Sequence, residues 1–125
     1  MADLLIDTDI FIDHIRRARP IPPTMMGSYS IITRSELFSG DELEEVAVQA
    51  LLAPHDEVDV GRGIAERAGR LRRTSALSLP DALIAATALE HHLDLVTRNK
   101  RHFERVPELR LRDPDEFTQD RSSVE

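Results

Sequence analysis

The fold of this chain is decided by one short stretch, Ala2-Asp3-Leu4-Leu5-Ile6-Asp7-Thr8-Asp9-Ile10. Its apolar run, residues 4–6, is continuous, which is typical of a strand buried on both faces of a sheet. The run stops at Asp7, and apolar residues at helical spacing begin almost at once. We therefore expect the strand to carry Asp7 to the carboxyl edge of the sheet, where open α/β folds bind their ligands.

The rest of the chain alternates strand patterns with helix patterns, which predicts an α/β fold with right-handed crossovers and a mostly parallel sheet. Further short strands are predicted over residues 29–32, 58–60 and 93–97, and a fifth, at an edge, over residues 109–112. Helices are predicted over residues 9–18, 33–40, 41–53, 64–73 and 78–89. Residues 1–118 are expected to form one domain, and residues 119–125 a frayed tail.

Two of the predicted helices carry an acid near their start. Thr33-Arg34-Ser35-Glu36 has the spacing of a capping box, which places Glu36 in the first turn of the helix after the second strand. In Ser78-Leu79-Pro80-Asp81, Ser78 is the predicted N-cap and Asp81 lies in the first turn. The helix that follows is apolar nearly all round, so we expect it to be central and closely packed.

Composition excludes several classes of protein. The chain has no cysteine, which rules out disulfides, thiolate zinc sites and cysteine nucleophiles. No stretch approaches the roughly 18 apolar residues of a membrane span, and no basic segment of a secretory signal precedes the first strand. A cytoplasmic protein is therefore expected. The five histidines lack the spacing of a zinc protease motif and are interpreted as surface or packing residues.

The net charge of −7 argues against a general electrostatic attraction to nucleic acid. Arginine has a planar group suited to phosphate, so local phosphate contacts remain open. From the sequence alone, however, solvated helix faces are the favoured interpretation of the basic runs. These runs are Arg16, Arg17 and Arg19; Arg67, Arg70, Arg72 and Arg73; and Arg98, Lys100 and Arg101. Aromatic residues are too few for a base-stacking surface.

Four polar residues share one topological position, at the end of a strand or in the segment that follows it: Asp7, Glu36, Asp81 and Asn99. A parallel sheet brings such positions to the same side. Each acid alone also fits a helix cap, and Asn99 fits a turn. Two carboxylates about 4 Å apart repel by roughly 4 kcal/mol at an effective dielectric constant of about 20, so three together favour a bound cation. Oxygen ligands without cysteine favour Mg²⁺ or Mn²⁺.

Four blocks of the chain resemble the motifs of the PIN-domain ribonucleases, in the same order and with fitting separations. The blocks are Leu5-Ile6-Asp7-Thr8-Asp9, Ser30-Ile31-Ile32-Thr33-Arg34-Ser35-Glu36-Leu37, Leu79-Pro80-Asp81-Ala82-Leu83-Ile84-Ala85-Ala86-Thr87-Ala88 and Thr97-Arg98-Asn99-Lys100-Arg101-His102-Phe103. Within that family the chain is similar to the VapC toxins of toxin–antitoxin pairs. The resemblance implies a three-layer α/β/α sandwich, Mg²⁺-dependent cleavage of RNA, a VapB-type antitoxin as inhibitor, and a homodimer.

The resemblance also assigns roles to the site residues. It places the family's three metal-binding acids at Asp7, Glu36 and Asp81. Many members have a fourth acid where this chain has Asn99, so either the amide oxygen of Asn99 takes that part or the site works with three acids. Asp9 stands where the family commonly has asparagine, and it either adds charge or begins the first helix, the second interpretation being favoured. The resemblance raises the expectation that Arg98, Lys100 and Arg101 contact RNA phosphate.

Two other functions fit parts of the pattern. Asp7-Thr8-Asp9 matches the nucleophile motif of the haloacid dehalogenases, which predicts a phosphotransfer enzyme, although that family needs a longer chain. A non-catalytic PIN-like interaction module is the other alternative, and Asn99 is its only support. For an interface with a partner, the helices offer an apolar set that would otherwise belong to the core: Ile12, Ile15, Leu43, Val46 and Leu51.

Overall fold

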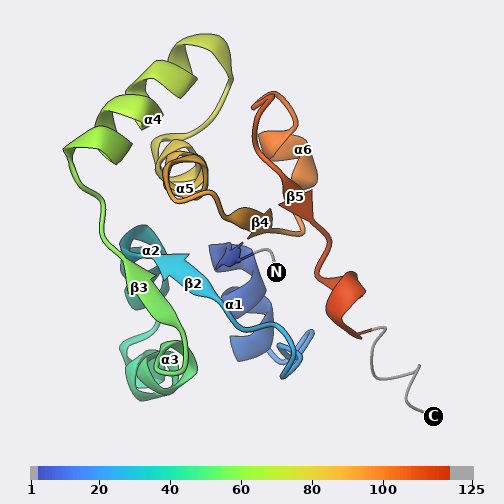
Figure 1. Ribbon diagram of the computed structural model, residues 1–125. Helices are drawn as coiled ribbons and strands as arrows, with labels where there is room; N and C mark the ends of the chain where they lie inside the picture. The colour runs from blue at the N-terminus through green and yellow to red at the C-terminus, as the bar shows by residue number, and fades with distance from the viewer. Residues whose placement is uncertain (1–2, 119–125) are drawn as a thin grey trace.

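The computed structural model describes residues 3–118 and contains one five-stranded sheet (Figure 1). The strands are β1 (Leu4–Ile6), β2 (Ser28–Ser30), β3 (Asp56–Val58), β4 (Asp94–Val96) and β5 (Leu111–Arg112). Their order is β3-β2-β1-β4-β5, and all four pairings are parallel. The predicted α/β class is confirmed, with β1 at the centre and β5 at an edge. The tail predicted for residues 119–125 lies outside the described residues.

Helices cover both faces of the sheet and make the fold a three-layer sandwich. They are α1 (Thr8–Ile15), α2 (Ile31–Phe38), the short 3-10 helix η1 (Glu42–Glu44), α3 (Glu45–Leu52), α4 (Arg62–Thr74), α5 (Leu79–Glu90) and α6 (Lys100–Phe103). Figure 1 shows α4, α5 and α6 on one side of the sheet and α1 and α3 on the other. The sequence pattern does not predict η1 or α6.

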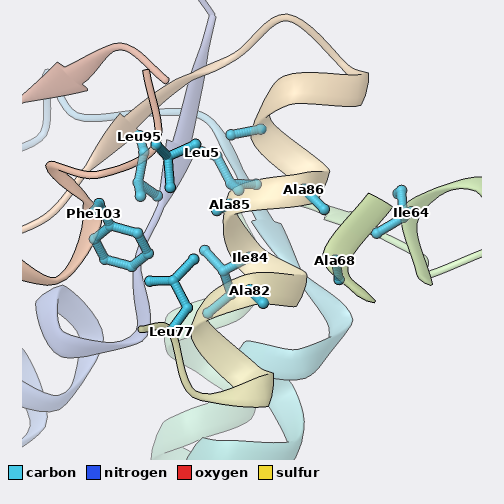
Figure 2. Packing of buried hydrophobic residues seen from close by; sticks show 12 residues of the cluster. Leu5, Ile64, Ala68, Leu77, Ala82, Ile84, Ala85, Ala86, Leu95 and Phe103 are labelled. Atoms are coloured by element: carbon cyan, nitrogen blue, oxygen red, sulfur yellow. The ribbon is translucent and has the colours of Figure 1, made fainter. Parts of the chain in front are cut away.

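Alternate residues of the central strands point into two separate cores, as the pleat of a strand requires. Leu5 and Leu95 face α5, whose buried alanines let the helix lie close to the sheet (Figure 2). Leu4, Ile6 and Val96 face the opposite core, which α1, α2 and α3 complete. Burial on both faces explains why β1 is a continuous apolar run, and the predicted central position of α5 is confirmed.

The start of α2 differs from the prediction. Ser30, not Thr33, is the N-cap, because the side chain of Ser30 accepts a hydrogen bond of 3.0 Å from the backbone N–H of Ile32. The predicted second strand therefore ends two residues early, and the capping box at Thr33 is wrong. Glu36 consequently lies in the second turn of α2, not in the first. Ser78 is the N-cap of α5, as predicted, and accepts from the N–H of Asp81.

The face that α3 presents to the core also differs from the sequence pattern. Val48 and Leu52 are buried, whereas Leu43 and Val46 are 85% and 81% exposed. Leu43 belongs to the 3-10 turn η1, whereas Val46 lies within α3, two residues before Val48, and residues two apart do not share a helix face. Within residues 3–118, no helix is long and apolar enough to cross a membrane.

Other boundaries shift by a few residues. Helix α1 begins at Thr8 and ends three residues before the predicted end, because Arg17 adopts a positive φ of 59° and the N–H of Ala18 turns back to the carbonyl of Asp13. Strand β3 lies two residues earlier than predicted, and β5 occupies the second half of its predicted range.

Candidate active site

Asp7 lies at the centre of the candidate site, at the carboxyl end of the central strand. Its N–H continues the sheet by donating to the carbonyl of Val96, and its side chain is 4% exposed. One carboxylate oxygen accepts a hydrogen bond of 2.8 Å from the N–H of Thr8, which makes Asp7 the N-cap of α1. Asp7 therefore fills the capping role and also points its second oxygen toward the loop after β4.

Thr97 connects Asp7 to the loop that carries Asn99. Its hydroxyl donates to Oδ2 of Asp7 at 2.8 Å and accepts from the N–H of Asn99 at 3.0 Å. Because Thr97 follows β4 directly and β4 pairs with β1 in register, the sheet itself sets this contact. The backbone of Asn99 is thus brought to the same edge as Asp7, as the topology predicted.

Thr8 connects Asp7 to Glu36. The hydroxyl of Thr8 donates a hydrogen bond of 2.6 Å to Oε1 of Glu36 and lies 2.9 Å from the hydroxyl of Thr33. Since Thr8 has one hydroxyl proton, Thr33 is the donor in the second contact. Both threonines are buried, so the bond between them is shielded from water and fixes the side of α2 that carries Glu36, whose own bond to Thr8 is partly buried.

Asp81 reaches the site from the first turn of α5. Its N–H is bonded to the Ser78 side chain, but no hydrogen bond to its carboxylate is formed within residues 3–118. Oδ2 of Asp81 lies 3.4 Å from Nδ1 of His102, on α6, in an ion-pair geometry when the imidazole is protonated. Asp81 is also close enough to Asp7 for its charge to raise the pKa of Asp7.

Burial and like charge shape the electrostatics of the site. Burial, together with the nearby charge of Asp9, raises the pKa of Asp7 to about 7. Burial also raises the pKa of Asp9, although its Oδ2 accepts from the N–H of Arg98 at 3.0 Å. Asp9 lies in the first turn of α1 and adds charge beside Asp7, but it does not begin the helix, because α1 starts at Thr8 with Asp7 as its N-cap.

These observations fit a divalent cation. Oδ1 of Asp9 is buried and has no hydrogen-bond partner in the described part of the chain, and Asp7 is held where its charged form is costly. A hard cation would relieve both costs, and carboxylates are its preferred ligands. As the side chains stand, no three acidic or histidine residues among residues 3–118 are close enough together to hold an ion. The acidic side chains would therefore have to move closer together before they could coordinate one ion.

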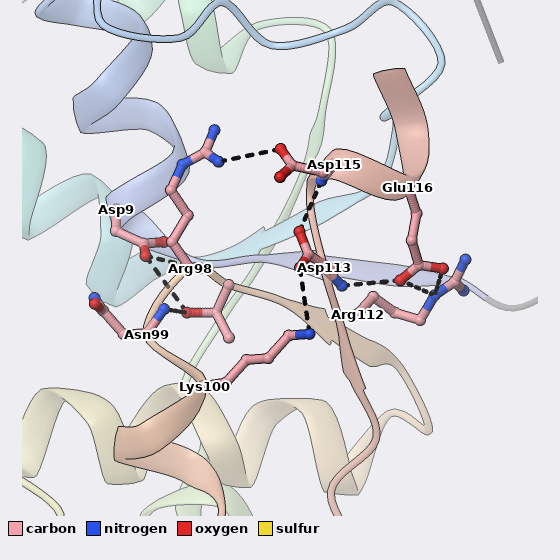
Figure 3. A network of polar contacts seen from close by, with 9 residues as sticks. Asp9, Arg98, Asn99, Lys100, Arg112, Asp113, Asp115 and Glu116 are labelled. Carbon is pink, nitrogen blue, oxygen red and sulfur yellow. Dashed lines mark hydrogen bonds and ion pairs between the residues drawn. The ribbon is translucent and has the colours of Figure 1, made fainter. Parts of the chain in front are cut away.

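The basic residues that follow β4, in the loop and at the start of α6, are largely engaged by acids (Figure 3). Nε of Arg98 donates to Asp13 at 2.6 Å, and its guanidinium lies 3.8 Å from Asp115. Lys100 lies 3.4 Å from Asp113. Arg101 is exposed and forms no ion pair within residues 3–118. The three candidate RNA contacts thus differ in how much of their charge is already balanced.

Sequence reasoning missed the two threonines that link the acids, Thr8 and Thr97, and the histidine beside Asp81. Thr8 stands between two acids and Thr97 directly follows a strand, so their positions carried a signal. His102 carried none, because its neighbour Asp81 is distant in the sequence and α6 was not predicted.

Known proteins resemble this chain in sequence and in fold. Residues 4–109 match the family described as the PIN domain. Ribonuclease VapC19 of Mycobacterium tuberculosis is 34% identical over 120 residues, which cover 84% of this chain and 95% of that protein. A toxin–antitoxin complex from Klebsiella pneumoniae aligns with a TM-score of 0.74 and 32% identity, over 90% of this chain and 98% of that chain.

DNA-bound VapBC from Salmonella typhimurium aligns with a TM-score of 0.79 and 26% identity, over 91% of this chain and 99% of that chain. The family match covers most of the chain. The identity to ribonuclease VapC19 and the shared fold are consistent with that match. The chain belongs to the PIN-domain family.

Proposed function

We propose that this chain is the ribonuclease toxin of a VapBC-type toxin–antitoxin pair, and that it cleaves RNA phosphodiester bonds in the cytoplasm with a divalent metal ion. The single observation that supports the proposal is that Thr8 joins Asp7 to Glu36 at one edge of the sheet, while Asp81 lies close enough for its charge to raise the pKa of Asp7. The identity to ribonuclease VapC19 supports the reaction. PIN-domain ribonucleases are generally dependent on divalent metals, and we propose Mg²⁺, with Mn²⁺ as a substitute.

In this mechanism Asp7, Glu36 and Asp81 would hold the metal, and Asn99 would supply an amide oxygen in place of a fourth acid. The ion would supply a water of lowered pKa and stabilise charge on the phosphate. Thr97 and Thr8 keep the carboxylates of Asp7 and Glu36 oriented, through hydrogen bonds of 2.8 Å and 2.6 Å. Asp9 adds a negative charge that strengthens the attraction for the cation.

Substrate contact is proposed for the residues around Asn99. Arg101 is exposed beside the acidic edge, and we propose that it binds an RNA phosphate. Arg98 and Lys100 remain candidates for the same role, but each would first have to leave its carboxylate partner.

We propose two protein partners, a VapB-type antitoxin and a second copy of this chain. The exposed side chains of Leu43 and Val46 provide apolar surface for such contacts. A groove lined by Ile12, Ile15 and Leu37 lies beside Glu36, so a partner seated there would reach the acidic edge. The toxin–antitoxin complex with 32% identity to this chain supports the first partner.

The test is cleavage of a single-stranded RNA by the purified chain, with Mg²⁺ and with EDTA. We expect cleavage that requires the metal and is lost in Asp81→Asn, while the circular dichroism spectrum stays unchanged. Equal cleavage by Asp81→Asn would contradict the proposal. A folded chain with no nuclease activity under any metal would instead support the non-catalytic module, and trapping of a phosphate mimic on Asp7 would support the phosphotransfer alternative.

A further inference from the structure

Helix α4 is strongly basic in a chain that is acidic as a whole. Its thirteen residues include one acid, Glu66, and five arginines. The arginines are Arg62, Arg67, Arg70, Arg72 and Arg73. Residues 41–60, by contrast, contain seven acids and neither lysine nor arginine. Figure 1 places α3, within that acidic segment, and α4 at opposite ends of the molecule.

The arginines of α4 differ in how their charge is balanced. Arg67 forms an ion pair of 2.6 Å with Glu90, and Nε of Arg72 donates to the carbonyl of Leu77. Arg70 and Arg73 are exposed, and their side chains form no hydrogen bond or ion pair within residues 3–118. Unlike Arg98 and Lys100 on the other side of α5, they are available without the loss of an existing ion pair.

The basic end of α4 lies near the acidic edge. Helices α4 and α5 are antiparallel. Gly63, at the start of α4, lies beside the side chain of Glu90 at the end of α5, and Arg72 at the end of α4 reaches Leu77 just before α5. Asp81 lies in the first turn of α5, at that same end. In Figure 1, α4 and α6 lie on either side of α5.

We propose that Arg70 and Arg73, at the C-terminal end of α4, bind the phosphate backbone of the RNA strand on the α4 side of the acidic edge. The inference rests on the proposed function, because it takes RNA as the substrate. The acidic edge itself repels phosphate except where a metal is bound, so affinity for the strand must come from basic side chains around that edge. Exposed guanidinium groups without carboxylate partners release condensed counterions from the strand when they bind it.

Helix α4 also offers a matched control at its other end. Arg62, at the other end of the helix, lies about 16 Å from Arg73 along the axis, since each residue of an α-helix adds about 1.5 Å. Arg62 is exposed and has no ion pair among residues 3–118 either. It therefore provides a matched control, because the same residue type on the same helix lies far from Asp81.

The experiment compares the parent chain with the double variant Arg70→Gln/Arg73→Gln and with Arg62→Gln. Binding of a fluorescently labelled single-stranded RNA is measured by anisotropy in EDTA, over a series of salt concentrations. We expect the slope of log affinity against log salt to become shallower in the double variant, by about 0.7 for each phosphate that it no longer neutralises. With metal added, its KM for RNA should rise while kcat stays constant, and Arg62→Gln should match the parent.

Two outcomes would overturn the inference. One is a double variant whose salt slope and KM equal those of the parent. The other is a double variant that binds RNA as the parent does but binds an acidic antitoxin more weakly. That result would show that this end of α4 binds a protein. Failure of the proposed function is seen separately, as absence of RNA cleavage by the parent chain itself. The salt dependence of RNA binding is measured in EDTA, without cleavage. It therefore tests the role of α4 whether or not the chain is a ribonuclease. Circular dichroism shows that the variants are folded.

Discussion

The hydroxyl of Thr97 donates a hydrogen bond of 2.8 Å to Oδ2 of Asp7, although 90 residues separate the two in the chain. The contact exists because Ile6 pairs with Val96 in adjacent parallel strands, so the residues that follow them meet at the sheet edge. The bond favours the charged form of Asp7 but does not offset its burial, and the pKa of Asp7 stays raised to about 7. The fold therefore holds this carboxylate in an unfavourable environment that a cation would improve.

Replacement of Asp7 by asparagine should separate activity from stability. We expect Asp7→Asn to lower kcat/KM for RNA by at least about 100-fold, because metal-assisted charge stabilisation amounts to several kcal/mol. In EDTA at pH 8 the same variant should be more stable than the parent, by about 1–3 kcal/mol, because it removes a buried charge that lies beside Asp9. Cleavage assays and urea denaturation measure the two effects.

Asp59→Asn is the control for that change. Asp59 is exposed and forms no hydrogen bond or ion pair within residues 3–118, so both activity and stability should match the parent. A loss of stability in Asp7→Asn in EDTA would show that its capping bond to Thr8 outweighs the electrostatic relief.

Removal of the Thr8 hydroxyl should weaken metal binding through Glu36. Thr8→Val preserves the shape of the side chain but leaves Oε1 of Glu36 and the hydroxyl of Thr33 without their partner. We expect metal affinity to fall about 10- to 100-fold, as is usual when a residue that orients a ligand is removed. Unfolding should be easier by about 1–3 kcal/mol because buried polar groups lose a hydrogen bond. Calorimetric titration with Mn²⁺ measures the affinity directly.

Two further variants make that result specific. Thr8→Ser keeps a hydroxyl and should restore most of the metal affinity. Thr24→Val removes a hydroxyl whose bond, to the carbonyl of Phe117, lies away from the acidic edge, so it should leave metal binding unchanged. Equal metal affinity in Thr8→Val and the parent would leave Thr8 with a structural role only.

Much of the fold and the main acids could be predicted because the deciding signals are local. The apolar run of β1 ends at Asp7, and Ser78 and Pro80 mark the start of α5 within four residues of Asp81. The alternation of strands with helices predicts a parallel sheet. Because the carboxyl ends of all its strands lie on one side, Asp7 and Asn99 are expected at the same edge.

The remaining features depend on contacts that a local pattern does not contain. Ser30 and Thr33 are both good N-caps, and Thr33 is drawn into the helix because its hydroxyl bonds to Thr8, 25 residues away. Val46 and Val48 both lie in α3 on different faces, and only packing against the sheet and its neighbouring helices decides that Val48 is buried and Val46 exposed.

Arg98 should matter for stability more than for RNA binding. Its guanidinium joins α1, through Asp13, to the segment after β5, through Asp115, and its side chain is only 19% exposed. We expect Arg98→Gln to lower the free energy of unfolding by about 1–2 kcal/mol and to leave the salt dependence of RNA binding unchanged. Arg101→Gln should leave the free energy of unfolding unchanged and make the salt dependence of RNA binding shallower. The reason is that the Arg101 side chain is exposed and has no ion pair among residues 3–118. A shallower salt slope in Arg98→Gln would show that its ion pairs open to bind phosphate.

His55 should make the protein less stable as pH falls. Its Nδ1 accepts from the N–H of Gly27, its ring packs edge-on against Phe11, and burial lowers its pKa. A folded pKa below the unfolded value of about 6.5 means that this contribution is complete above pH 6.5 and is lost as pH falls through the folded pKa. Asp56 opposes the shift without cancelling it. Urea denaturation between pH 7.5 and 5 should therefore show a smaller pH-dependent loss in His55→Gln than in the parent, and no difference for the exposed His91→Gln. Parallel pH curves for His55→Gln and the parent would mean that His55 is protonated in the folded protein without cost.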